Sequence, residues 1–319
     1  MSAANTTIGL ALGSGAARGL AHIGVLKVLE EAAIPISYVA GTSIGAFIGA
    51  LYAAGVPIQQ MEKTLCDLDW RALTRVLAPI LPTSGLLDSK KVANFMAELL
   101  PVKTFEELSI PLAVTATDVE SGEALVIHQG SLLQGLHAAT AFPGIFTPAL
   151  WRGRFLVDGG LCNPVPADVA YSMGAQRVIG VSAIPALTRP LPAALPNISR
   201  SLPKARRTLR EFFTSNQIER LFRDIWQNDN RQQNTSPNEQ PAEHPKHRAP
   251  GIFKVCSRSV AIMENQINDL RLEKEDIDLL IRPCFNDISL LDFHRAKEAI
   301  AAGETATRQL LPEIRRLLK

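Results

Sequence analysis

The sequence predicts an α/β fold in which helices cover both faces of a mainly parallel sheet. Strand-like and helix-like segments alternate over residues 8–54, in the order β-α-β-α. Parallel strands joined by covering helices are the simplest arrangement of such an alternation. Residues 32–61 contain no charged side chain, as expected for a strand and a helix that are buried on both faces.

The first four elements follow from hydrophobic spacing and from helix breakers. Residues 8–12 are a short apolar strand that ends in glycines, and 18–32 carries apolar residues at helical spacing. A second strand is expected at 37–40, followed by a helix of small residues at 44–54 that a Gly-Val-Pro sequence ends. This helix would be about 16 Å long at ~1.5 Å per residue. Crossing a membrane takes ~20 continuous apolar residues, so no membrane span is predicted here.

The later elements are shorter or less regular. Strands are expected at 111–118, 123–128, 154–157, 177–182 and 278–281. Helices are expected within 59–100, over 254–272 and from 292 onward. No internal repeat is visible along the chain.

Charge is distributed unevenly along the 319 residues. Lys and Arg number 33 against 31 Asp and Glu, a net charge of +2 that gives no indication of nucleic-acid binding. The segment 187–250 nevertheless holds 11 basic and 6 acidic residues, a net charge of +5, which leaves −3 for the rest. We predict a single domain over 1–319, with a core at about 8–186 and 251–303 and a basic insertion rich in Pro, Asn and Gln at 187–250.

The insertion 187–250 is open to two interpretations. Residues 206–227 carry apolar side chains at helical spacing, whereas 228–250 has almost nothing to bury and is expected to be disordered. A basic amphipathic helix at 206–227 could lie on an anionic lipid surface. Alternatively, this helix packs on the domain or acts as a lid, with a solvated tail.

The cysteines and the N-terminus point to a cytoplasmic protein. Cys66, Cys162, Cys256 and Cys284 are far apart and form no C-x-x-C pair. We therefore expect reduced and mostly buried thiols rather than a zinc site or a disulfide framework. The N-terminus lacks the basic segment and the long apolar run of a signal peptide. The expected location is the cytoplasm, with peripheral contact to the inner membrane face as an option.

The first chemical motif is GTSIG at 41–45, which matches G-x-S-x-G between a predicted strand and a predicted helix. In this context Gly41 and Gly45 allow a sharp turn that projects the hydroxyl of Ser43 above the sheet edge. The helix N-terminus behind it favours developing negative charge. Ser43 is therefore a candidate nucleophile. The alternative is a glycine-rich turn in which Ser43 only caps the helix.

The second motif is the glycine-rich loop GSGAARG at 13–19, directly after the first strand. Arg18 stands where the dinucleotide-binding fingerprint requires its third glycine, and no GK[ST] sequence follows. Neither type of nucleotide-binding loop is therefore predicted. Two interpretations remain, an oxyanion hole made of backbone N–H groups at the start of a helix and a simple tight turn.

The third motif is VDGG at 157–160, which places Asp158 at the end of an apolar strand with Gly159 and Gly160 behind it. Such a sequence is often only a turn, but a carboxylate beside a serine can act as its base in a dry site. None of the six histidines occupies the late strand-to-helix loop expected for a Ser-His-Asp triad. Two interpretations of Asp158 therefore stay open, a turn residue and a carboxylate that acts as the base of a nearby serine.

Taken in this order, the three motifs resemble those of the patatin-like phospholipase family, and most closely its small bacterial branch related to neuropathy target esterase. The resemblance covers about 8–186 and 252–303. It rests on GSGAARGLAHIGVLK (13–27), GTSIGA (41–46) and DGGLCNPVP (158–166), with ATAFPGIFTP (139–148) and the IRP…LDF pattern (281–293) as support.

The resemblance implies a patatin-like three-layer α/β/α sandwich with a nucleophile elbow and a Ser–Asp dyad that needs no histidine. By motif position, Ser43 would be the nucleophile and Asp158 the base. The backbone amides of Gly15 and Ala16 would form the oxyanion hole, with Arg18 as the arginine of the loop. The supporting positions are Gly13, Ser14, Gly41, Gly45, Gly159 and Gly160. Family loops often read Gly-Gly-Gly, whereas this loop has serine and alanine in two of those places.

The function implied by the resemblance is that of a serine acyl hydrolase, which cleaves fatty-acyl esters of (lyso)phospholipids or related lipids through an acyl-enzyme. It requires neither a metal nor a cofactor. The expected partner is the lipid substrate and not nucleic acid, and the oligomeric state stays open. An alternative, motivated by the insertion, is a regulatory or scaffolding protein of the same fold whose hydrolysis is vestigial.

Overall fold

The computed structural model describes residues 6–67, 89–184, 252–274 and 276–318. By its contacts the chain divides into two units, and the sheet and the candidate site lie in the unit made of Met1–Leu187 and Ser259–Lys319. The helix expected at 206–227 and the tail expected at 228–250 fall outside the described residues. Within the described ranges, no helix is both long and apolar enough to cross a lipid bilayer.

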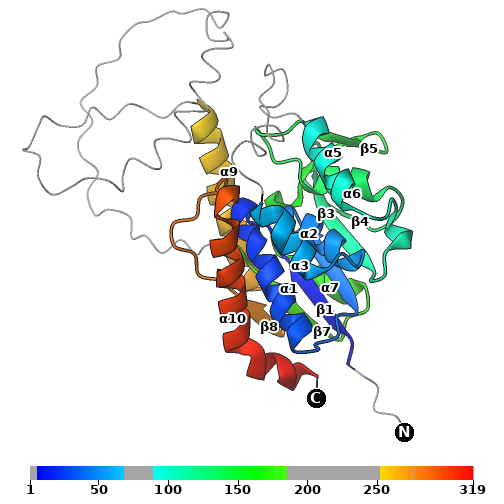
Figure 1. Ribbon diagram of the computed structural model, residues 1–319. Coiled ribbons are helices and arrows are strands. Elements are labelled where there is room, and N and C mark those ends of the chain that lie inside the picture. Colours follow the sequence, from blue (N-terminus) through cyan, green and yellow to red (C-terminus); the bar gives the residue numbers. More distant parts are fainter. Residues whose placement is uncertain (1–5, 68–88, 185–251, 275, 319) are drawn as a thin grey trace, which may run out of the picture. The chain divides into compact units, whose positions relative to one another are not determined.

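An eight-stranded mixed sheet forms the middle layer of this unit (Figure 1). The strand order is β5-β6-β3-β2-β1-β7-β8, and β4 pairs with β3 outside this path. The parallel strands are β1 Ile8–Leu12, β2 Tyr38–Thr42, β3 Leu112–Asp118, β7 Arg177–Val181 and β8 Leu279–Ile281. The antiparallel strands are β4 Ala124–Ile127, β5 Ala149–Trp151 and β6 Arg154–Asp158. The prediction of a mainly parallel central sheet is confirmed.

Each face of the sheet has its own apolar core, because successive strand residues point to opposite faces. The helices of the larger core are α1 Ala21–Glu31, α2 Ile44–Ala53, α3 Ile58–Cys66, α5 Ser89–Leu99, α6 Leu132–Ala139 and α10 Ala296–Leu317. On the other face, Ala11, Ala40 and Ala113 lie opposite one another on β1, β2 and β3. They pack with α7 Ala167–Ser172 and the end of α9 Ile252–Leu272. The prediction of an α/β/α sandwich is confirmed.

Two glycines set how closely α1 and α10 approach each other on the larger core (Figure 1). A Cβ atom on Gly24 would overlap the backbone carbonyl oxygen of Ile300. A Cβ atom on Gly303 would overlap the backbone carbonyl oxygen of Ala21. Both obstacles are backbone atoms, which cannot turn aside as a flexible side chain could. The packing of α1 on α10 therefore requires glycine at both positions.

Replacing Gly303 with Ala is expected to lower the free energy of unfolding by about 1–3 kcal/mol, because the added methyl group overpacks the helix contact. In a helix without such a contact, the same change would raise stability by up to about 1 kcal/mol through helix propensity. Urea unfolding measures the change, with Gln309→Ala on an exposed position of α10 as the control. Unchanged or higher stability of Gly303→Ala would contradict the close approach of the helices.

The predicted elements agree with the described ones to within two residues at most boundaries. The sequence did not predict β5, α6 or α7, which have only three, eight and six residues. Such short segments contain too little of a periodic pattern to be recognised. The terminal helical region expected from residue 292 begins with the 3-10 helix η5 Phe293–Arg295 and continues as α10 to Leu317.

The expectation that the cysteines are mostly buried is wrong for the three whose side chains are described. Cys66 and Cys162 are half-buried and Cys284 is exposed, and all three are free thiols. Their positions explain the difference, because Cys66 ends α3 and the other two lie in loops. The apolar cores are built from the middles of strands and helices instead.

Candidate functional site

Ser43 is the single residue between β2 and α2, and the turn around it is sterically demanding. Its φ of 56° lies in the left-handed region that non-glycine residues rarely adopt. A Cβ atom on Gly41 would lie 2.5 Å from the Cα atom of Ala46, and one on Gly45 would overlap the carbonyl oxygen of Leu12. The two glycines of G-x-S-x-G are therefore required by close backbone approach. This turn holds the Ser43 hydroxyl at the end of β2.

Asp158 ends β6 directly beside this hydroxyl. The Oγ of Ser43 donates a hydrogen bond of 2.5 Å to Oδ2 of Asp158. The other carboxylate oxygen accepts the backbone N–H of Gly160 at 2.8 Å. The backbone of Asp158 is also held, because its N–H donates to the carbonyl of Ala141 and its carbonyl accepts from Oγ1 of Thr117, both at 3.0 Å. The carboxylate is therefore fixed in position on both sides.

The buried environment of Asp158 raises the pKa of its carboxyl group. Burial raises the pKa of Asp158 to about 7, and the negative charge of Glu264 acts in the same direction. The hydrogen bonds from Ser43 and Gly160 stabilise the ionised form and partly oppose this rise in pKa. A carboxyl group with a pKa near neutrality can both accept and release a proton under physiological conditions.

The glycine-rich loop leads from β1 into the 3-10 helix η1 Ala16–Leu20 and presents backbone N–H groups to the same site. Gly13 and Ser14 donate their N–H groups to backbone carbonyls at 2.9 and 2.8 Å. By contrast, no described residue accepts a hydrogen bond from the N–H of Gly15 or Ala16. Both of these residues line the cavity that Ser43 faces. Ala16 has a φ of 50°, which glycine would adopt at lower cost.

Two side chains hold the glycine-rich loop in place through hydrogen bonds. Nε2 of His22 donates to the carbonyl oxygen of Gly13 at 2.7 Å. Burial lowers the pKa of His22 to about 4, so the ring is neutral at physiological pH. Nε of Arg18 donates to the carbonyl oxygen of Ile288 at 2.6 Å, which ties η1 to the segment before η5. Arg18, predicted as the loop arginine, thus anchors the loop in this structure.

A second carboxylate, which the sequence did not single out, lies in the same site. Glu264 of α9 is only 7% exposed, and it accepts a hydrogen bond from Oγ of Ser14 in the glycine-rich loop. A Cβ atom on Gly160 would overlap Oε1 of Glu264. Burial raises the pKa of Glu264, whereas the Ser14 hydroxyl and the charge of Arg18 act in the opposite direction.

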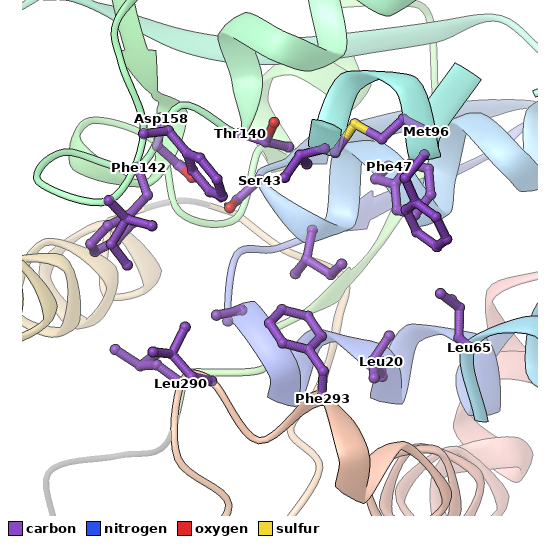
Figure 2. Close-up of a pocket in the computed structure, with 18 of the residues that line it drawn as sticks. Leu20, Ser43, Phe47, Leu65, Met96, Thr140, Phe142, Asp158, Leu290 and Phe293 are labelled. Atoms are coloured by element: carbon purple, nitrogen blue, oxygen red, sulfur yellow. Dashed lines mark hydrogen bonds between the residues drawn. The ribbon is translucent and has the colours of Figure 1, made fainter. Parts of the chain in front are cut away.

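A cavity of about 160 Å³ opens at this group of residues. Figure 2 shows Ser43 and Asp158 turned toward one another at its wall, with Leu20 and Phe293 on the opposite side. Most of the lining is apolar and comes from η1, α2, α3, α5, the loop after α6 and η5. Examples are Leu20, Phe47, Leu65, Met96, Phe142 and Phe293. The cavity can therefore hold an apolar chain against a hydroxyl–carboxylate pair.

The structure brings the three motifs together at one cavity. Ser43, Asp158, Gly15 and Ala16 all line one cavity. Gly13, Ser14, Gly41, Gly45, Gly159 and Gly160 lie in the three turns that deliver them. No histidine is among the described residues that line the cavity. In the described part of the chain, no group of three or more His, Cys, Asp and Glu side chains could hold a metal ion.

Comparison with known proteins identifies the family. Residues 10–171 match the profile of the patatin-like phospholipase family. An NTE family protein of Mycobacterium tuberculosis is 30% identical over 328 residues, covering 95% of this chain and 91% of that protein. Patatin-like phospholipase domain-containing protein 6 of Mus musculus is 38% identical over 182 residues, covering 55% of this chain and 13% of that protein.

Among solved structures, VipD from Legionella pneumophila aligns with 97% of this chain and 67% of its own, at 15% identity and a TM-score of 0.44. The family assignment rests on sequence alone, through the profile match and the nearly full-length relative. The chain belongs to the patatin-like phospholipase family, in the branch of the NTE family proteins.

Proposed function

We propose that this protein is a serine acyl hydrolase that cleaves fatty-acyl esters of (lyso)phospholipids or related lipids. The reaction proceeds through a dyad of Ser43 and Asp158 and an acyl-enzyme. The observation that carries the proposal is the 2.5 Å hydrogen bond from Oγ of Ser43 to the buried carboxylate of Asp158, at the wall of an apolar cavity. Membership of the patatin-like phospholipase family supports lipid hydrolysis in general.

In the first half of the reaction, Oγ of Ser43 attacks the carbonyl carbon of the ester while Asp158 accepts its proton. The resulting tetrahedral intermediate carries a negative oxygen. When the bond to the alcohol breaks, Asp158 returns the proton to the leaving oxygen, and the fatty acyl group stays bound to Ser43. In the second half, Asp158 takes a proton from a water molecule, which attacks the acyl-enzyme. Asp158 then returns this proton to Oγ of Ser43 as the bond between Oγ and the acyl group breaks, and the fatty acid is released.

The N–H groups of Gly15 and Ala16 supply the oxyanion hole in this mechanism. Neither donates to a described residue, and both line the cavity at Ser43. The loop is held in place before substrate arrives, by the bonds from His22 and Arg18. A preorganised donor of this kind contributes about 3–4 kcal/mol to transition-state stabilisation.

The apolar lining of the cavity supports a fatty-acyl substrate. A hydrocarbon chain gains roughly 0.8 kcal/mol for each methylene group that leaves water. Phe47, Met96 and Phe293 offer such a surface within the cavity that Ser43 lines. The polar head of the ester would stay at the Ser43 end, where the hydroxyl, the carboxylate and the N–H groups of Gly15 and Ala16 are found.

The hydrolysis rate is expected to depend on the ionisation of Asp158. For p-nitrophenyl butyrate, kcat/KM should rise as the pH increases through about 7, because only the ionised carboxylate can accept the Ser43 proton. The free energy of unfolding should instead fall as the pH increases. The folded-state pKa of Asp158 lies above its unfolded value of about 3.9, so ionisation destabilises the fold as the pH rises from about 4 to about 7.

A pH–rate profile of the full chain measures how kcat/KM depends on pH, with the uncatalysed hydrolysis subtracted at each pH. A value of kcat/KM that stays constant between about pH 5 and pH 8 would contradict a base with the pKa of Asp158.

Covalent labelling tests the proposed function directly. The folded protein is treated with a fluorophosphonate probe, and the labelled peptide is identified by mass spectrometry. In parallel, release of free fatty acid is measured from palmitoyl-lysophosphatidylcholine and from dioleoyl-phosphatidylcholine vesicles. We expect the label on Ser43 and fatty acid from at least one lipid. Absence of both in folded protein would favour the regulatory or scaffolding alternative.

The basic insertion 187–250 bears on where the reaction takes place. Peripheral membrane contact through 206–227, on the inner face of the membrane, stays a prediction from composition, as do the single-domain organisation and a cytoplasmic location.

A further inference from the structure

We propose that Glu264 is a positioning residue of the catalytic site, which holds the oxyanion loop through Ser14 and places a second carboxylate beside Asp158. This inference rests on the proposed dyad of Ser43 and Asp158, and extends it by a residue from a distant part of the chain. Ser14 and Glu264 are 250 positions apart in the sequence.

The first support is the contact of Glu264 with the glycine-rich loop. Oε1 of Glu264 accepts the hydrogen bond from Oγ of Ser14, and both side chains are buried. Ser14 directly precedes Gly15, whose N–H belongs to the proposed oxyanion hole. The hydrogen bond from the Ser14 side chain to Glu264 therefore limits rotation of the backbone that sets the direction of this N–H. The loop is thus anchored on three sides, by His22, Arg18 and Glu264.

The second support is the position of Glu264 relative to Asp158. A Cβ atom on Gly160 would overlap Oε1 of Glu264 and lie 3.2 Å from Oδ1 of Asp158. The two carboxylates therefore converge on the same side of Gly160, where only a glycine leaves room for both. Glu264 and Asp158 both line the cavity, together with Ser43.

The charges around Glu264 come from three other parts of the chain. Arg18 of η1 attracts its negative charge, and Asp158 of β6 faces it with a like charge. Asp292, just before η5, also attracts the positive charge of Arg18, so this guanidinium interacts with the carboxylates of both Glu264 and Asp292. Repulsion between the two carboxylates favours the protonated form of Asp158. Glu264 thereby helps to keep the proposed base in a range where it can both accept and return a proton.

Three variants of the full chain separate the two effects. Glu264→Gln keeps the shape of the side chain and an acceptor for Ser14 but removes the charge. Glu264→Ala removes both, and Ser14→Ala removes the bond to the loop alone. Glu273→Gln, an exposed carboxylate just after α9, is the matched control. The readouts are kcat and KM for p-nitrophenyl butyrate and the pH dependence of kcat/KM.

Glu264→Gln is expected to move the acid limb of the pH–rate profile to lower pH, because Asp158 loses a neighbouring negative charge. Glu264→Ala and Ser14→Ala should each lower kcat up to about a hundredfold with KM little changed, since misplaced catalytic groups cost rate rather than ground-state binding. The double variant Ser14→Ala/Glu264→Ala should be no slower than Glu264→Ala, because both changes remove the same contact.

An acid limb at the wild-type pH in Glu264→Gln would overturn the inference, as would a wild-type kcat in a folded Glu264→Ala variant. If Glu264→Ala does not fold, the pH at which the acid limb of Glu264→Gln lies is the deciding measurement. The proposed dyad has a separate test. An active Ser43→Ala variant would reject the dyad itself. If Ser43→Ala is inactive but the Glu264 variants have the kcat and the pH–rate profile of the wild type, only the role of Glu264 is rejected.

Discussion

The Ser43→Ala variant is expected to lose ester hydrolysis, with kcat falling by about a million-fold, the size of effect found when a serine nucleophile is removed. No acyl-enzyme can form, because the atom that attacks the ester is gone. The fold should be retained, since alanine keeps the Cβ atom and meets the same backbone requirement at a φ of 56°. Among the described residues, the side-chain hydrogen bond that is lost is the 2.5 Å bond to Asp158.

The measurement is kcat for p-nitrophenyl butyrate, with thermal unfolding as the check on folding. Ser109→Ala, at an exposed serine, is the matched control and should retain wild-type activity. The fluorophosphonate label should be absent from Ser43→Ala and present in Ser109→Ala. Wild-type hydrolysis by Ser43→Ala would eliminate this serine as the nucleophile.

Replacing Asp158 with Asn is expected to lower kcat by at least about ten-thousandfold, the loss seen when a catalytic aspartate is made an amide. Asparagine has nearly the same shape and can still accept the N–H of Gly160, which now donates at 2.8 Å. It cannot accept a proton from Ser43 at neutral pH. The variant therefore separates the chemistry of the carboxylate from its place in the fold.

Stability distinguishes this change from a general loss of structure. Burial raises the pKa of Asp158 to about 7, so its ionised form is disfavoured in the folded protein. A neutral amide avoids this cost, and the free energy of unfolding at alkaline pH should be equal to or above that of the wild type. Urea unfolding and kcat are compared with those of Asp276→Asn, an exposed control. Full activity of Asp158→Asn would show that another group is the base.

Much of the fold could be predicted because the signals that specify it are local. The turn at Ser43 requires Gly41 and Gly45, since a Cβ atom at either would collide with neighbouring backbone. That requirement is visible as G-x-S-x-G in a span of five residues. Similarly, α2 Ile44–Ala53 is almost entirely buried, which explains why this part of the uncharged stretch contains no charged side chain. The short elements β5, α6 and α7 were missed because their patterns are too brief to be distinguished from loops.

The meeting of Ser43 and Asp158, 115 residues apart, depends on strand register. β2 runs parallel to β3 with Thr42 opposite Thr115, and β6 runs antiparallel to β3 with Asp158 opposite Ala116. Adjacent positions of β3 therefore bring the ends of the two other strands together. Neither segment encodes this register by itself, and only the resemblance of the ordered motifs to a family made the pairing predictable.

Glu264 shows what local patterns do not contain. In the sequence it is one polar residue of an expected helix at 254–272, and its spacing from Asn268 is that of any pair on one helix face. In the structure both residues are buried, and Glu264 reaches Ser14 and the neighbourhood of Asp158. A buried carboxylate requires donors and compensating charge, and here these come from the glycine-rich loop and η1.

The sequence by itself determined most of the strands and helices and the glycine-dependent turn at Ser43, and the resemblance of its motifs to a family added the candidate chemistry of Ser43 and Asp158. Turn sterics and hydrophobic periodicity act over a few neighbouring residues, so they can be recognised without the fold. Only the tertiary structure decided that Glu264 belongs to the site, that the N–H groups of Gly15 and Ala16 stay unpaired among the described residues, and that the pKa of Asp158 rises to about 7. Desolvation and charge repulsion depend on neighbours that are distant in the chain and near in space.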